Sequence, residues 1–176
     1  MKIKQNLIYS VICIFLLLIL NSCGYHIGSI AHPQIKTIAI APIKNETYIP
    51  NAAEYMKQAL SESFQKDASW KIKGIEEADC IMYARILDIK ITATNISSNK
   101  SNSSITYMTS LFSMTVTLEF TVIIPGRSKP LVSTTQVSDT TQYQVPADLY
   151  TAQQSALQQA CYTVAMDAVS ATTEAW

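Results

Sequence analysis

The sequence predicts an α+β fold in which two helices pack on one face of a mainly antiparallel or mixed sheet of about four strands. Apolar side chains recur at helical spacing around residues 52–66 and 149–168. Between these two stretches, apolar and polar side chains alternate with the period of two that is typical of strands. Runs of strands flanked by helices favour an α+β domain, with the chain order strand, helix, three strands, helix.

The first strand and the first helix are predicted by composition and spacing. Residues 35–40 are rich in β-branched side chains, and Pro42 follows them, so we expect a strand that ends there. Asn51 precedes Glu54 by three residues, which resembles a capping box and predicts a helix start. The apolar face of this helix is expected to pack on the sheet and comprises Ala52, Met56, Ala59, Leu60, Ser63 and Phe64.

A long strand is predicted from Cys80 to Ile91, after a short edge segment at residues 70–73. Its odd-numbered positions form one row, from Ile81 to Ile91, and its even-numbered positions form the other, from Cys80 to Lys90. Both rows contain apolar residues, so both faces are expected to be partly covered. Arg85 lies in a mainly apolar row, and we expect it to pair with a carboxylate rather than to bind a ligand. Residues 96–104 are polar without apolar spacing and predict a loop.

The next two strands are predicted to form a hairpin. Residues 113–124 alternate Ser, Thr and Glu with Met, Val, Leu, Phe and Ile, so one face should meet the core and the other water or a partner. Residues 125–130 close the turn, and residues 131–143 form the return strand. Arg127 and Lys129 stand at the tip without a neighbouring acid. They are either solvated cations or contacts for phosphate groups, and the residues alone leave both readings open.

The last element is predicted to be a helix with a narrow, Ala-rich stripe. Pro146 fixes the approach, and Asp148 is expected in the first turn, where the helix dipole favours an anion. Small side chains on one side would let this helix approach the sheet closely, and they lie at Ala152, Ala156, Ala160 and Ala168.

The N-terminus predicts a lipoprotein signal peptide at residues 1–22. Lys2 and Lys4 precede an apolar run that is shorter than the roughly 20 residues of a membrane-spanning helix. The run ends in Leu20-Asn21-Ser22-Cys23, which resembles the lipobox of bacterial lipoproteins. In that pattern cleavage precedes Cys23, whose thiol takes a diacylglycerol and whose new amino group is acylated, so that the protein is held at a membrane. Gly24 stands where an Asp would resemble an inner-membrane retention signal, which favours the outer membrane.

Composition limits the remaining possibilities. We expect a tether at residues 23–34 and a single domain at residues 35–176. Removing the signal peptide removes two Lys and no acid, so the net charge falls from zero to −2, which gives no electrostatic case for nucleic acid. Cys80 and Cys161 lie in apolar patterns typical of buried free thiols, although an oxidising compartment would allow them to pair.

Neither an enzyme nor a metal or cofactor site is predicted. The only histidines, His26 and His32, lie in the expected tether without a cluster of Cys or acidic residues. The sequence contains no Gly-x-Ser-x-Gly elbow and no phosphate-binding loop. A small lipid-anchored domain for binding or assembly is therefore the favoured class.

Several short motifs, in order after the lipobox, resemble the LPS-assembly lipoprotein (LptE) family. They are Cys23-Gly24-Tyr25-His26, Ile38-Ala39-Ile40-Ala41-Pro42, Asn45-Glu46-Thr47-Tyr48, Ala78-Asp79 before the long strand, Tyr143, and a C-terminal helix that ends near Trp176. The chain departs from the family in Ile43, where an aromatic residue is frequent, and in its long Ser/Asn-rich loop at residues 96–104.

The resemblance implies a protein in the periplasmic leaflet of the outer membrane. Family members form a complex with the large β-barrel protein LptD, assist its assembly, and are thought to bind lipopolysaccharide on its way to the cell surface. On this resemblance, Arg127 and Lys129 become candidates for contact with the phosphates of lipid A. The alternative is a lipid-anchored periplasmic adaptor of another envelope machine, because a fold of this kind does not fix function.

Overall fold

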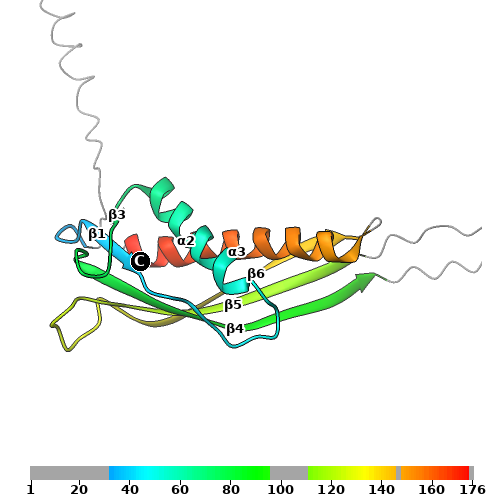
Figure 1. Ribbon diagram of the computed structural model, residues 1–176, viewed down its shortest axis with the longest axis horizontal. Helices are drawn as coiled ribbons and strands as arrows, with labels where there is room; N and C mark the ends of the chain where they lie inside the picture. Colours follow the sequence, from blue (N-terminus) through cyan, green and yellow to red (C-terminus); the bar gives the residue numbers. More distant parts are fainter. Residues whose placement is uncertain (1–31, 96–110, 146–147, 175–176) are drawn as a thin grey trace, which may run out of the picture.

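A mixed six-stranded sheet with two helices on one face forms the protein (Figure 1). The computed structural model describes residues 32–95, 111–145 and 148–174. The strands lie in the order β3-β1-β4-β5-β6, and β2 pairs with β4 outside this path. In chain order the elements are β1 (Thr37–Ile40), β2 (Lys44–Asn45), α2 (Ala52–Asp67), β3 (Lys71–Ile72), β4 (Cys80–Asn95), β5 (Leu111–Ile123), β6 (Val132–Gln144) and α3 (Leu149–Thr173).

The predicted α+β class with two helices on a sheet is confirmed, but the prediction of about four strands is wrong. The difference lies in β2 and β3, which have two residues each and pair parallel to β4 and β1. The segment at residues 70–73 was expected at an edge, and β3 is that edge strand. Strands this short contain no complete period of alternation, so β2 left no pattern that a sequence reading could detect.

The two rows predicted for β4 hold only for its first half. Cys80, Met82, Ala84 and Ile86 are buried, whereas Tyr83 and Arg85 are exposed. The register with β5 then shifts between Ile86 and Asp88, which marks a β-bulge. Beyond the bulge, Ile89 packs against the core and Lys90 is exposed, so the odd-numbered residues have changed face.

Residues of β5 and β6 follow the predicted alternation. The apolar row of β5 is buried and comprises Met114, Val116, Leu118, Phe120 and Val122. The two strands are antiparallel, and residues 124–131 connect them as the predicted hairpin. Gly126 adopts a φ of 81° in this turn, a left-handed conformation that favours glycine.

Helix α2 begins at Ala52 as predicted, but the predicted capping box is wrong. Asn51 has a φ of 63° and its side chain makes no capping hydrogen bond. A side-chain cap requires extended backbone at this position, whereas Asn51 occupies the left-handed region that asparagine tolerates in turns. All six residues of the predicted apolar face are buried, namely Ala52, Met56, Ala59, Leu60, Ser63 and Phe64.

Helix α3 begins at Leu149, immediately after the residue that the sequence predicts in its first turn. Asp148 is the N-cap rather than a first-turn residue, and its carboxylate accepts hydrogen bonds from the Tyr150 backbone N–H at 3.0 Å and from the Thr151 hydroxyl. These bonds lower the pKa of Asp148. Of the predicted Ala-rich stripe, Ala156, Ala160 and Ala168 are buried, whereas Ala152 is only partly buried. Helix α3 packs against α2, β6 and β5.

Cys80 and Cys161 are free, buried thiols, as the apolar patterns around them indicate. Burial is the main reason that the pKa of each thiol is raised, to about 12, so both are protonated at neutral pH. They therefore serve as small apolar core residues.

The N-terminal end of the described chain and the β5–β6 hairpin tip lie at the same end of the sheet (Figure 1). In the register, Ile38 on β1 is opposite Cys80, and Ile81 is opposite Ile123 just before the hairpin turn. Residues 32–36, which lead into β1, therefore lie at the hairpin end of the sheet.

Several predictions concern residues outside the described ranges. These are the signal peptide at 1–22, Cys23, most of the tether, the loop at 96–104, Pro146 and Trp176. Neither of the described helices is long and apolar enough to cross a membrane.

The β4 bulge predicts that substitutions at two adjacent residues differ in their effect on the free energy of unfolding. Ile89→Gln should lower the free energy of unfolding by about 1–2 kcal/mol, because it removes apolar area that packs on the core. Lys90→Gln should change it by less than about 0.5 kcal/mol, because Lys90 is exposed. Urea unfolding followed by circular dichroism measures both. A larger loss for Lys90→Gln than for Ile89→Gln would mean that the bulge is absent.

Candidate functional site: the open sheet face and the hairpin tip

No helix packs on the face of the sheet away from α2 and α3 within the described residues (Figure 1). We call this the open face. A small buried cluster of Ala39, Ala41 and Ile81 lies on this face near the hairpin end. On β5 and β6 the open face consists of cross-strand pairs of hydroxyl and amide side chains with one carboxylate. These pairs are Ser113 with Gln142, Thr115 with Thr140, Thr117 with Ser138, and Glu119 with Gln136.

Hydrogen bonds between hydroxyl groups connect neighbouring strands on this face. Oγ1 of Thr115 lies 2.7 Å from Oγ1 of Thr140, and Oγ1 of Thr121 lies 3.1 Å from Oγ1 of Thr134. A threonine hydroxyl both donates and accepts, so each pair keeps capacity for a further partner. The open face is therefore a mainly neutral surface with many hydrogen-bonding groups.

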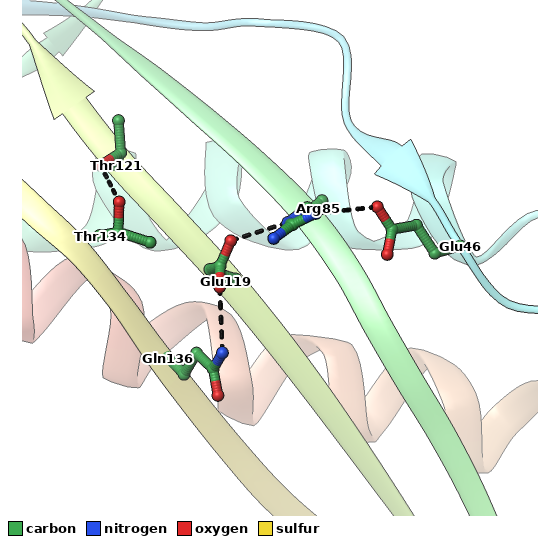
Figure 2. A network of polar contacts seen from close by, with 6 residues as sticks. All are labelled: Glu46, Arg85, Glu119, Thr121, Thr134 and Gln136. Atoms are coloured by element: carbon green, nitrogen blue, oxygen red, sulfur yellow. Dashed lines mark hydrogen bonds and ion pairs between the residues drawn. The ribbon is translucent and has the colours of Figure 1, made fainter.

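Arg85 lies at the centre of a charged network on the open face (Figure 2). Its Nε donates to Glu119 Oε1 at 2.7 Å, and its Nη1 donates to Glu46 Oε1 at 3.1 Å. Gln136 Nε2 donates to the other Glu119 oxygen at 3.0 Å. The expectation that Arg85 pairs with a carboxylate is confirmed. It has two such partners, Glu119 on β5 and Glu46 directly after β2.

The network changes the acidity of its members. The hydrogen bond from Arg85 is the largest cause of the lowered pKa of Glu119, and the bond from Gln136 adds to it. The two carboxylates raise the pKa of Arg85. Because the Arg85 side chain is 46 % exposed, water screens these pairs and each contributes little to stability.

A hollow of about 210 Å³ adjoins this network and was not anticipated from the sequence. Tyr83, Lys44 and Pro42 line it together with Arg85, Glu119, Thr121 and Thr134. Tyr83 is 48 % exposed. The sequence signal for this hollow was Tyr83, a large aromatic residue on a strand. Because both rows of β4 are apolar in the sequence, its outward position could not be recognised.

Arg127 and Lys129 are both exposed at the hairpin tip. Neither forms an ion pair with any residue that the structure describes. Their charges differ in this respect from that of Arg85, which two carboxylates compensate. The structure thus places the two sequence-predicted cations together, several residues beyond the Arg85 network along β5.

The described part of the chain contains no group of three or more His, Cys, Asp or Glu residues that would hold a metal ion. His32 lies beside Trp70, with 6.2 Å between ring centroids, and His26 and Cys23 lie outside the described ranges.

Comparison with known proteins decides the family. The model of the family described as "LptE: Lipopolysaccharide-assembly" matches residues 35–171, which is most of the chain. The chain belongs to the LptE family. This is a family of lipoproteins without catalytic activity, in keeping with the non-enzymatic class that the sequence favours. No curated protein matches the chain at a significant level.

Solved structures share the LptE-family fold at low sequence identity. Hypothetical protein CT253 from Chlamydia trachomatis has a TM-score of 0.52 at 9 % identity, covering 78 % of this chain and 98 % of its own. The PelC dodecamer from Paraburkholderia phytofirmans has a TM-score of 0.51 at 11 % identity, covering 85 % and 95 %. Protein XCC0632 from Xanthomonas campestris has a TM-score of 0.51 at 12 % identity, covering 80 % and 87 %. These similarities concern the fold alone.

Because Arg85 lowers the pKa of Glu119, the folded protein holds this proton less tightly than the unfolded chain does. The resulting stability is present above the carboxyl pKa of the unfolded chain and is lost as the pH falls through the lower pKa of the folded state. Glu119→Gln should therefore reduce the loss of stability between about pH 5 and pH 3, measured by urea unfolding. Glu76→Gln removes the same charge from an exposed residue with no ion pair in the described structure, and serves as the control. Equal slopes for the two variants would contradict the role of the network.

Proposed function

We propose that this chain is an outer-membrane lipoprotein that forms a complex with an LptD-type β-barrel and assists the transport and assembly of lipopolysaccharide. The observation that carries the proposal is the match of residues 35–171 to the lipopolysaccharide-assembly family. In this proposal residues 1–22 are removed as a signal peptide, and Cys23 carries the lipid that holds the protein in the periplasmic leaflet.

The arrangement of the domain supports a role close to the membrane surface. Residues 23–34, fully extended, span at most about 40 Å, so the end of the sheet at which residue 35 lies stays near the bilayer. The hairpin tip lies at this end (Figure 1). A tether of this length would allow Arg127 and Lys129 to reach the phosphates of lipid A at the level of the membrane headgroups.

The chemistry of the tip supports contact with phosphate. Arg127 and Lys129 have no carboxylate partner among the described residues, so their charges remain available to an anion. A guanidinium group binds phosphate through two parallel hydrogen bonds, and an ammonium group binds it as a point charge. The tip would hold the glycolipid by its phosphates without any catalytic step.

The open face and the edge of β6 support contact with a protein partner. β6 is an edge strand of 13 residues, and it contains no Lys, Arg or Pro to discourage association. The mainly neutral, hydroxyl-rich surface beside it would suit the polar interior of a barrel.

Co-purification tests the proposed function. The full-length lipoprotein with a C-terminal tag, solubilised from membranes in mild detergent, should bring down a large β-barrel protein. Recovery of a different machine without a barrel would favour the alternative, a lipid-anchored periplasmic adaptor.

The hairpin tip makes a separate prediction for lipopolysaccharide binding. Arg127→Ala combined with Lys129→Ala should weaken binding by about tenfold or more, since two charge-assisted contacts are lost. The loss should shrink as the salt concentration rises, because exposed charges are screened. Isothermal titration of the detergent-solubilised protein measures the affinity.

Lys57→Ala combined with Lys71→Ala removes the same charge from exposed positions on α2 and β3 and is the matched control. Unaltered affinity of the tip variant, or an equal loss in the control, would show that Arg127 and Lys129 make no specific contact.

A further inference from the structure

The hollow on the open face combines an exposed aromatic ring with a hydrogen-bonding network. Tyr83 lies in the middle of the sheet opposite Thr121, yet it is 48 % exposed, and its hydroxyl group has no hydrogen-bond partner among the described residues. Sheets with one covered face usually place polar side chains on the other. An aromatic ring at such a position offers a flat apolar surface to a ligand. We call the hollow of about 210 Å³ beside this ring the Tyr83 pocket.

The polar groups of the Tyr83 pocket retain unused hydrogen-bonding capacity. Arg85 uses two of its five N–H groups for Glu119 and Glu46. Each oxygen of Glu119 accepts one hydrogen bond, from Arg85 or Gln136, and a carboxylate oxygen accepts two. Figure 2 shows these groups and the Thr121–Thr134 hydroxyl pair along one side of the sheet. Donors and acceptors therefore lie within one small area.

The charges around the Tyr83 pocket favour a neutral ligand. The positive charges of Arg85 and Lys44 are equal in number to the negative charges of Glu46 and Glu119, and Arg85 contacts both carboxylates directly. A phosphate group would meet an uncompensated cation at the hairpin tip but carboxylates here. The pocket and the tip are thus suited to different parts of a ligand.

A sugar ring is chemically complementary to the groups that line the Tyr83 pocket. Its C–H face is apolar with a slight positive charge and packs on the negative face of an aromatic ring. Its hydroxyl groups both donate and accept, which suits a guanidinium group, a carboxylate and threonine hydroxyls side by side. The volume is below that of a typical drug-sized site, so the pocket would hold a single ring of a longer saccharide.

We propose that the Tyr83 pocket binds a neutral sugar residue of the glycolipid, and this inference rests on the proposed function. Thr121 is six residues before Arg127, so the pocket lies roughly 15–20 Å from the hairpin tip. A glycolipid with its phosphates at the tip would place its oligosaccharide along β4 and β5, over Tyr83. The open face then sets the direction in which the glycolipid lies.

Titration with an oligosaccharide tests the inference. The probe is the saccharide of lipopolysaccharide after chemical removal of acyl chains and phosphates, added to the full-length lipoprotein in detergent. Tyr83→Ala should weaken binding about tenfold, because the ring surface is lost. Tyr83→Phe should stay within about threefold of the parent protein, because the ring remains. Tyr150→Ala removes a tyrosine that is 64 % exposed at the start of α3 and should leave the affinity unchanged.

Three results would overturn the inference. They are equal affinity of Tyr83→Ala and the parent protein, no binding of the stripped oligosaccharide by the parent, and tighter Tyr83-dependent binding of a peptidoglycan disaccharide than of the oligosaccharide. Barrel co-purification distinguishes this failure from a failure of the proposed function. If the barrel is recovered without oligosaccharide binding, only the Tyr83 pocket is wrong. If the parent protein recovers no barrel, the proposed function itself is contradicted.

Discussion

The structure depends on one constraint, which is that every long strand must turn its apolar row toward the same two helices. β5 meets this constraint with a regular alternation, and its five buried residues form the centre of the core. β4 meets it only because a bulge after Ile86 changes the phase of the strand, so that Ile89 faces the core and Asp88 and Lys90 face water. With the helices on one side, polar groups accumulate on the other. The open face is therefore a consequence of how the core is built. The threonine hydroxyl pairs, the Arg85 network and the Tyr83 pocket all lie on it.

Long elements could be predicted from the sequence because each contains several periods of its pattern. The six buried positions of α2, the alternation of β5 and the hairpin turn all followed from spacing, and so did the pairing of Arg85 with an acid. β2 could not be predicted because two residues are too few to show a periodic pattern. The two rows of β4 were predicted to run unbroken along the strand, because a bulge depends on pairing with β5, which one strand alone does not reveal. The predicted cap at Asn51 was wrong because this residue has a left-handed backbone, whereas a side-chain cap requires an extended one. The Tyr83 pocket was missed because Pro42, Tyr83 and Thr134 come together only in the folded sheet.

Membership of the LptE family and the geometry of the domain lead to one account of the proposed function. The uncompensated cations at the hairpin tip and the neutral Tyr83 pocket differ in charge, and they lie in sequence along the same hairpin and sheet. In the proposed arrangement, the lipid-anchored tether enters at the end of the sheet that carries the tip. A phosphorylated glycolipid at the membrane surface combines both kinds of group in the same order, phosphates near the bilayer and sugars beyond. In this proposal, the edge of β6 and the remaining open face are available to contact the barrel. In this account the helices build the core and take no part in recognition.

Site-specific photo-cross-linking in intact cells tests most directly whether the open face performs recognition. A photoreactive residue at Ser138 would lie on the open face, and one at Asp167 would lie on the exposed side of α3. Both positions are solvent-accessible, so neither substitution should disturb the core. Recognition by the open face predicts cross-links from Ser138 to the barrel protein or to lipopolysaccharide. Cross-links to these partners from Asp167, with none from Ser138, would contradict it.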